Sequence, residues 1–206
     1  MKNNQDLIRL GFLASGHGSN MQTIMDACKE GQLQARPIVV ISNNADSGAL
    51  ERARVENIVA CHLSSTTHPD TTLLDAAITG ALKSHHVDLV ILAGYIKMIG
   101  PKVLDAFGGK IINIHPALLP KYGGKGMYGM KVHEAVIAAG ETETGVTIHV
   151  VDAEYDRGPV LAQRVVAIKP DDTPETLAAR VLETEHEIYV DTLRQVISGE
   201  IQLPQI

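Results

Sequence analysis

Residues 10–20, LGFLASGHGSN, place a short apolar run directly before a glycine-rich turn and the start of a helical pattern. Three further apolar runs without polar alternation follow, and helical patterns separate them. Such runs are typical of parallel strands that helices cover on both faces. The alternation predicts an α/β fold with a doubly wound, mostly parallel sheet of the Rossmann-like type. The expected strands are residues 10–14, 38–41, 87–93 and 111–114, and the expected helices are residues 20–30, 47–57 and 70–85.

The pattern changes after Pro120, where shorter elements are expected. They are a helix at residues 132–139 and strands at residues 146–151 and 160–168. The last helix is well marked, because Thr173 suits the N-cap, Pro174 suits the first helical position and Ser198-Gly199 suits the end. No repeat, low-complexity tract or linker interrupts the sequence, so we expect one domain over residues 1–206.

The composition limits the possible functions. With 206 residues, 45% hydrophobic residues and a formal charge of −6, the chain lacks the basic balance that non-specific nucleic-acid binding requires. Its most apolar stretch, residues 87–99, is too short to span a bilayer, and the N-terminus has no signal-like apolar core. Cys28, Cys61 and the histidines show no disulfide or metal-ligand spacing. We therefore expect a cytoplasmic enzyme that acts on small molecules, contains no metal and is a monomer or a homodimer.

The turn at Ser15–Asn20 is a candidate anion site. Small residues let backbone N–H groups approach an anion, and a helix N-terminus favours negative charge. The dinucleotide fingerprint would need glycine where Met21 stands, and an acidic residue where Ser42-Asn43-Asn44 follows the second strand. A phosphate monoester therefore fits better than NAD. The alternative is a tight turn in which Ser19 or Asn20 only caps the helix.

The segment Ile111–Pro116 carries the strongest catalytic signal. Because strand side chains alternate, Asn113 and His115 share one face while Ile112 and Ile114 share the other. Pro116 ends the strand, so both polar side chains lie at the edge where open α/β sheets bind ligands. Histidine moves protons near neutral pH, and an asparagine amide can donate to a developing oxyanion. The alternative is a pair that only satisfies loop backbone.

Two acidic features are candidate partners of this pair. A carboxylate from the turn after residue 151 would raise the pKa of His115 and orient its ring, but spacing does not choose among Asp152, Glu154 and Asp156. In the last helix, Glu185 has apolar residues three and four positions away on both sides. A buried carboxylate there requires a partner, either a substrate amine or an internal arginine.

The glycine-rich loop at residues 123–129 is not a Walker loop, because Gly126 rather than Ser or Thr follows Lys125. It also follows Pro120 rather than a strand. We expect a mobile lid beside the site.

These motifs, in this order, resemble the folate-dependent glycinamide ribonucleotide formyltransferase family of purine synthesis. The resemblance extends from Gly11 to the final helix. Each piece is weak alone, and the set is specific: Gly16-His17-Gly18-Ser19-Asn20, Asn113-Ile114-His115-Pro116-Ala117-Leu118-Leu119-Pro120, Asp156-Arg157-Gly158-Pro159 and Glu185-His186.

The resemblance implies a role for each matching residue. Asn113, His115 and Asp156 match the catalytic trio, and Glu185 matches a residue that contacts the glycinamide end. The residues that match the phosphate site are Gly18, Ser19 and Asn20. The residues that match the folate site are Tyr95, Ile96, Lys97, Met98, Ile99 and, again, Asn113.

The implied reaction is attack of the substrate amine on the formyl carbon of 10-formyltetrahydrofolate. Asn113 and protonated His115 would stabilise the oxyanion, and Asp156 would favour the imidazolium. Two departures leave the contacts with the folate tail open. Extra residues stand at 125–130, and neither Thr71 nor Lys97 supplies the arginine found at these positions in some family members.

Three rivals remain. A formyltetrahydrofolate deformylase uses a similar trio with water as acceptor, but usually carries an additional N-terminal domain, whereas here the first strand begins within about ten residues of Met1. A methionyl-tRNA formyltransferase would need a C-terminal domain and a basic surface. From a different class, a non-catalytic nucleotide-binding module would use only the loop around Gly18.

Overall fold

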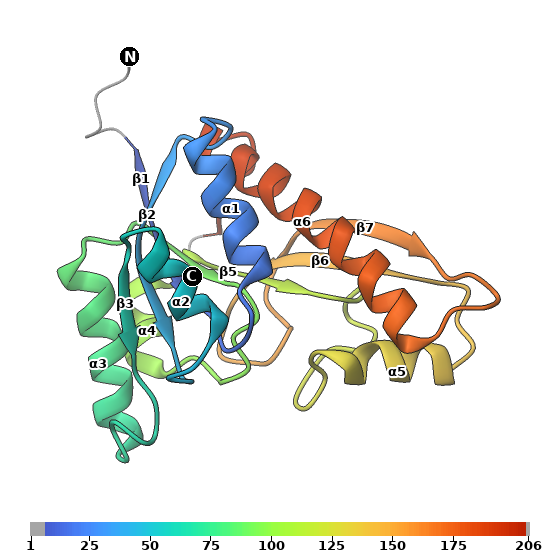
Figure 1. Ribbon diagram of the computed structural model, residues 1–206, viewed down its shortest axis with the longest axis horizontal. Coiled ribbons are helices and arrows are strands. Elements are labelled where there is room, and N and C mark those ends of the chain that lie inside the picture. Colours follow the sequence, from blue (N-terminus) through green and yellow to red (C-terminus); the bar gives the residue numbers. More distant parts are fainter. Residues whose placement is uncertain (1–6, 205–206) are drawn as a thin grey trace.

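A seven-stranded sheet in the order β3-β2-β1-β4-β5-β6-β7 forms the centre of the computed structural model, which describes residues 7–204 (Figure 1). The strands are β1 (Ile8–Leu13), β2 (Ala35–Ser42), β3 (Val59–His62), β4 (Leu89–Leu92), β5 (Ile111–His115), β6 (Glu143–Val150) and β7 (Val160–Ala167). Strands β1 to β5 pair in parallel, whereas β6 and β7 pair antiparallel. The predicted doubly wound, mostly parallel α/β fold is confirmed.

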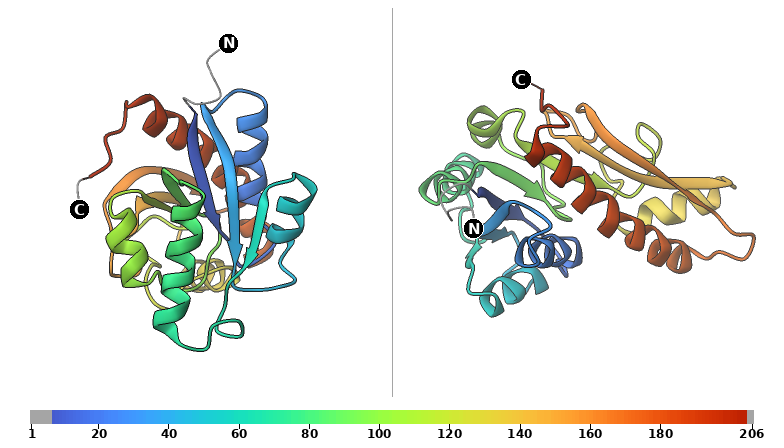
Figure 2. Two further views of the ribbon diagram at one scale, coloured as in Figure 1. Left: turned by 90° about the vertical axis from the view of Figure 1, so that its left-hand side faces the viewer. Right: turned by 90° about the horizontal axis from the view of Figure 1, so that it is seen from above.

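Helices cover both faces of this sheet. They are α1 (Ser19–Lys29), α2 (Gly48–Val55), α3 (Thr71–Ser84), α4 (Pro101–Phe107), α5 (Met130–Ala138) and α6 (Pro174–Ser198). Figure 2 shows α3 and α4 on one face and α1 and α2 on the other. The strand pleat explains both layers, because Leu10 and Phe12 of β1 pack with α1 while Leu13 packs with α3.

Two elements of the parallel half were missed by the sequence prediction, β3 and α4. Strand β3 is a short edge strand without a fully buried residue, so its pattern is weak. Helix α4 begins at Pro101 and draws its cap from α3, where the buried Asp75 carboxylate accepts from the backbone N–H groups of Lys102 (2.8 Å) and Val103 (3.3 Å). A cap supplied by a distant residue leaves no local signature.

Helix α6 follows its predicted boundaries. The Thr173 side chain accepts from the Thr176 N–H in a capping box, Pro174 is the first residue, and Gly199 ends the helix in the left-handed region. The helix runs along β6 and β7 and packs against α1 and α5 (Figure 1). Its buried Tyr189 hydroxyl lies 3.0 Å from the carbonyl oxygens of Leu92 and Ile112, which ties α6 to the last residue of β4 and the second residue of β5.

In the part of the chain that the structure describes, no helix combines the length and the apolarity that a membrane crossing requires.

Candidate functional site

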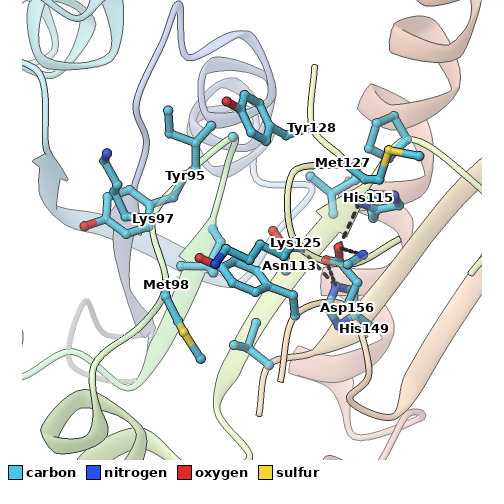
Figure 3. Close-up of a pocket in the computed structure, with 18 of the residues that line it drawn as sticks. Tyr95, Lys97, Met98, Asn113, His115, Lys125, Met127, Tyr128, His149 and Asp156 are labelled. Carbon is cyan, nitrogen blue, oxygen red and sulfur yellow. Dashed lines mark hydrogen bonds and ion pairs between the residues drawn. The ribbon is translucent and has the colours of Figure 1, made fainter. Parts of the chain in front are cut away.

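A cavity of about 520 Å³ opens at the edge where β4 and β5 end. The segment after β4, the end of β5, the loop before α5 and the turn after β6 line it (Figure 3). Asn20 of α1, His133 of α5 and Glu185 of α6 complete the lining. The structure thus brings Asn20, Glu185 and the segment after β4 to the same cavity as Asn113, His115 and Asp156.

Asn113 and His115 both line this cavity, as their alternation in β5 predicts. The His115 side chain is buried, with 4% of its surface exposed. Its Nε2–H donates to the carbonyl oxygen of Tyr122 at 2.8 Å, which assigns the lone pair of the neutral ring to Nδ1. Since Nδ1 faces the carboxylate of Asp156 at 3.6 Å, a proton taken up there would lie between the two groups.

Asp156 is the carboxylate that the fold brings to His115. Its residue has φ 55°, and Gly158 packs so closely that an added Cβ would lie 1.8 Å from the Val150 carbonyl oxygen. Only glycine allows this turn to fold back against β6. The Asp156 Oδ2 also accepts from the Gly124 N–H at 2.8 Å. Asp152 and Glu154 line the cavity, but neither contacts His115 among the described residues.

Burial and nearby charges act in opposite directions on this pair. Burial raises the pKa of Asp156, but contact with His149, the charge of His115 and the Gly124 N–H together lower it, so the group is ionised. Burial lowers the pKa of His115, and Asp156 and the Tyr122 carbonyl only partly oppose it. The sequence correctly predicts the direction in which Asp156 moves the pKa of His115, but not the larger effect of burial.

His149 of β6 is a member of the cluster that the sequence analysis did not single out. It stands opposite Asn113 in the β5–β6 register, and its Nε2 lies 3.0 Å from Asn113 Nδ2 and 3.6 Å from Asp156 Oδ1. Its Nδ1–H donates to the Val150 carbonyl at 3.0 Å, so Nε2 of the neutral ring accepts from the Asn113 amide. A histidine within an apolar strand-like run was the available signal.

Glu185 has a different partner from the two that the sequence suggested. Its Oε2 accepts from the Asn20 side-chain amide at 2.6 Å. Burial raises the pKa of Glu185, and the Asn20 hydrogen bond only partly opposes this. The N-cap of α1 is Gly18 in the left-handed region, without a side-chain hydrogen bond, so neither Ser19 nor Asn20 caps the helix. An added Cβ on Gly18 would lie 2.9 Å from Ala49 Cα.

The segment from Tyr95 to Ile99 forms the opposite wall. Ile96, Lys97 and Met98 are exposed, whereas Ile99 is buried. The Ile96 N–H donates to Ser15 Oγ at 3.1 Å, and Ser15 Oγ in turn donates to Asn43 Oδ1, so the segment is fixed to the ends of β1 and β2 through its backbone.

The glycine-rich loop before α5 closes part of the cavity. Lys125, Met127 and Tyr128 project from it into the cavity (Figure 3). Lys131 holds the Tyr128 ring through a cation–π contact, with Nζ 4.9 Å from the ring centroid. The expected lid motion stays a prediction.

Within residues 7–204, no group of three or more histidine, cysteine, aspartate or glutamate side chains has the arrangement of a metal site. The expected absence of a metal stays a prediction.

Comparison with known proteins identifies the family. The sequence pattern of the family described as "Formyl transferase" matches residues 8–193. A phosphoribosylglycinamide formyltransferase of Haemophilus influenzae is 40% identical over 95% of this chain and 90% of its own length. The chain belongs to the phosphoribosylglycinamide formyltransferase family. The solved structure of a glycinamide ribonucleotide transformylase from Symbiobacterium toebii superimposes with a TM-score of 0.91, at 38% identity, over 99% of this chain and 94% of that one.

Two further similarities are weaker evidence about this chain. A chloroplastic phosphoribosylglycinamide formyltransferase of Vigna unguiculata is 42% identical over 94% of this chain, which spans 62% of that relative's length. A formyltetrahydrofolate deformylase from Pseudomonas syringae has a TM-score of 0.86 but only 22% identity, over 97% of this chain and 64% of that one. This second likeness shows the shared fold alone.

Proposed function

We propose that this chain transfers the formyl group of 10-formyltetrahydrofolate to the amine of glycinamide ribonucleotide. The products are formylglycinamide ribonucleotide and tetrahydrofolate, in a step of de novo purine (IMP) biosynthesis. The observation that carries the proposal is the meeting of Asn113, His115 and Asp156 in one cavity of a chain of this family. The reaction needs a hydrogen-bond donor for the oxyanion and, beside it, a group that accepts a proton, and this cluster contains both.

The two substrates would bind on opposite walls. Glycinamide ribonucleotide would place its phosphate on the backbone N–H groups of Gly18, Ser19 and Asn20, where the helix N-terminus favours an anion. Glu185, already held by Asn20, would contact its glycinamide end. The folate would lie along the backbone and apolar side chains of Tyr95, Ile96, Lys97, Met98 and Ile99, and would reach Asn113 with its formyl group.

The chemical step is a balanced addition and elimination. The amine nitrogen forms a bond to the formyl carbon, and the carbonyl electron pair moves onto the oxygen. The Asn113 amide would donate to this oxyanion. Collapse of the tetrahedral intermediate breaks the bond from carbon to the folate N10, which takes up a proton as it leaves.

His115 would carry the proton between these two nitrogens. Because burial lowers the pKa of His115, its ring is mainly neutral near pH 7, and Nδ1, which faces Asp156, carries the lone pair that would accept the proton lost by the attacking amine. The resulting imidazolium would stabilise the oxyanion, and Asp156 would stabilise the imidazolium. In this scheme His115 reaches the protonated state that the family resemblance implies once it has taken the proton from the amine.

The function is tested with purified protein, glycinamide ribonucleotide and 10-formyltetrahydrofolate. We expect tetrahydrofolate and the formylated product to accumulate together, and no reaction without the acceptor. Folate consumption that is independent of the acceptor would replace this proposal with the deformylase reaction. Ligand binding without turnover would replace it with a non-catalytic nucleotide-binding module.

Composition and cysteine usage lead us to propose that the reaction takes place in the cytoplasm.

A further inference from the structure

One polar side chain of the cavity has no role in the chemistry above and no partner for its inner nitrogen. His133 of α5 lines the cavity and is buried, with 5% of its surface exposed. Its Nδ1 is shielded from solvent and makes no hydrogen bond to any described residue. Its Nε2 makes no hydrogen bond within residues 7–204 either, and it is not among the atoms that are shielded from solvent, in a residue that lines the cavity.

Such a residue lowers the stability of a folded protein. A buried polar atom without a partner destabilises the fold by about 1–3 kcal/mol, and buried polar groups are therefore nearly always bonded. The departure suggests that His133 is present for a ligand, since functional residues are where local rules of stability are broken.

The charge state of His133 narrows the kind of ligand group. Burial lowers the pKa of His133, and the nearby charge of His115 lowers it further. The ring is therefore neutral near pH 7, and it would become still harder to protonate once His115 gains a proton. A neutral imidazole suits a hydroxyl or a carboxamide, which both donate and accept, better than it suits a phosphate.

The position of His133 indicates which substrate carries that group. Helix α5 packs chiefly against α6, which holds Glu185 with its hydrogen bond to Asn20. This is the wall proposed for the phosphorylated substrate, opposite the Tyr95–Ile99 segment. Between its phosphate and its reacting amine, the neutral groups of that substrate that both donate and accept are the ribose hydroxyls and one carboxamide.

We propose that His133 is a substrate-binding residue that hydrogen-bonds a neutral group, ribose hydroxyl or carboxamide, of the phosphorylated amine substrate. The inference rests on the proposed function for the identity of that substrate. It assigns His133 to recognition of that substrate and leaves the proton transfer to His115.

The sign of the stability change separates this role from a structural one. In His133→Leu, an apolar side chain replaces an unpartnered polar one of similar size, which is neutral or favourable for folding. We therefore expect the melting temperature of His133→Leu to equal or exceed that of the wild type. Its KM for glycinamide ribonucleotide should rise about 5- to 30-fold, as expected when one hydrogen bond to a buried neutral group is removed. The KM for 10-formyltetrahydrofolate should stay within about twofold.

Two further variants control the comparison. His133→Gln places an amide near the Nε2 position and should recover part of the affinity. His68→Leu changes a histidine outside the cavity lining and should leave both KM values unchanged. An unchanged KM for the amine substrate in His133→Leu would overturn the proposal, as would a KM increase confined to the folate.

A substrate analogue identifies the group that His133 contacts. With glycinamide ribonucleotide lacking both free ribose hydroxyls, the ratio of KM values between His133→Leu and wild type should fall to about one if a hydroxyl is bound. The ratio should persist if the carboxamide is bound. Either outcome supports His133 as a binding residue, and a ratio of one with the full substrate contradicts it.

Calorimetric binding of glycinamide ribonucleotide without folate separates this inference from the proposed function. If wild type and His133→Leu bind glycinamide ribonucleotide with the same Kd, the inference is overturned and the proposed function is unaffected. Absence of wild-type binding would overturn the proposed function itself.

Discussion

On one wall of the cavity, Ile96 and Met98 have 43% and 55% of their surface exposed, and their segment is fixed mainly through its backbone. On the other wall, His115 and His149 have 4% and 2% exposed, and both approach Asp156 to 3.6 Å. The first wall offers an apolar surface and backbone groups that would accept a flat ring. The second holds polar groups in fixed directions before any substrate arrives, which is what stabilising a transition state requires. Substitutions on the two walls should therefore change different kinetic constants.

The largest effect should come from the polar wall. We expect Asn113→Ala or His115→Ala to lower kcat by about 10²–10³, because each removes a group that acts on the developing charge or on the proton. Both KM values should change little, and thermal unfolding should show an intact fold. His68→Ala is the matched control outside the cavity. A kcat within threefold of wild type in either cavity variant would contradict the catalytic role of the polar wall.

Asp156→Asn should have the next largest effect, and it should move the pH profile. His115 must be neutral to act as the base. Activity is therefore retained above the pKa of His115 and is lost as the pH falls through that pKa. Because burial lowers that pKa, the fall in wild-type activity should lie at a lower pH than the titration of an ordinary histidine. Asp156 raises the pKa of His115, so its removal should shift the acid limb to still lower pH.

The same variant should lower the plateau of kcat by about 10²-fold, since the imidazolium is left without its counter-charge. The profile of kcat against pH checks both expectations. An acid limb that moved to higher pH would mean that Asp156 does not stabilise the charged ring.

His149→Phe tests whether His149 positions the Asn113 side chain. The phenyl ring fills a similar volume but cannot accept from the Asn113 amide, so the Asn113 side chain would no longer be held in its orientation. We expect kcat to fall about tenfold with both KM values unchanged. Introduced into Asn113→Ala, the same change should have almost no further effect, because the group that it positions is already absent. Additive effects in the double variant would give His149 a separate role.

Met98→Ala tests the apolar wall. We expect KM for the folate to rise about three- to tenfold, because the shorter side chain buries less apolar surface against the bound folate, while kcat stays within twofold. Val55→Ala, at a site outside the cavity with 71% exposure, is the control for an exposed apolar truncation. A decrease confined to kcat would show that this wall takes part in the chemistry.

Thr173→Ala should have the smallest effect on catalysis and lies on neither wall. Removal of the side-chain cap of α6 should lower the free energy of unfolding by about 1 kcal/mol, measured by denaturant titration, and leave kcat unchanged. A parallel fall in activity would mean that the end of α6 is coupled to Glu185.

The parallel half of the fold was predictable because its strands are buried on both faces, so their apolar runs stand out from the helices between them. Helix α6 was predictable from its caps. What the sequence concealed depends on distant pairing: α4 is capped by Asp75 from α3, and β3 is a weak edge strand. In each case the deciding interaction lies far away in the sequence.

The candidate site divides in the same way. Asn113 and His115 were predictable from one strand, because alternation fixes their common face. The choice of Asp156 needed the left-handed turn that folds back onto β6, and spacing alone left three carboxylates open. His149 depends on the β5–β6 register, and the pairing of Asn20 with Glu185 joins residues 165 positions apart. Interactions of this kind exist only once the sheet and α6 are assembled.

The most direct test of the account is a single-turnover measurement with both substrates saturating, in wild type and in Asn113→Ala. Saturation removes binding from the comparison and leaves only the chemical step. The account predicts one tetrahydrofolate released for each formylated amine in the wild type, and a rate at least about 10²-fold lower in Asn113→Ala with an unchanged melting temperature. Equal rates in the two proteins, or tetrahydrofolate released without a formylated amine, would contradict it.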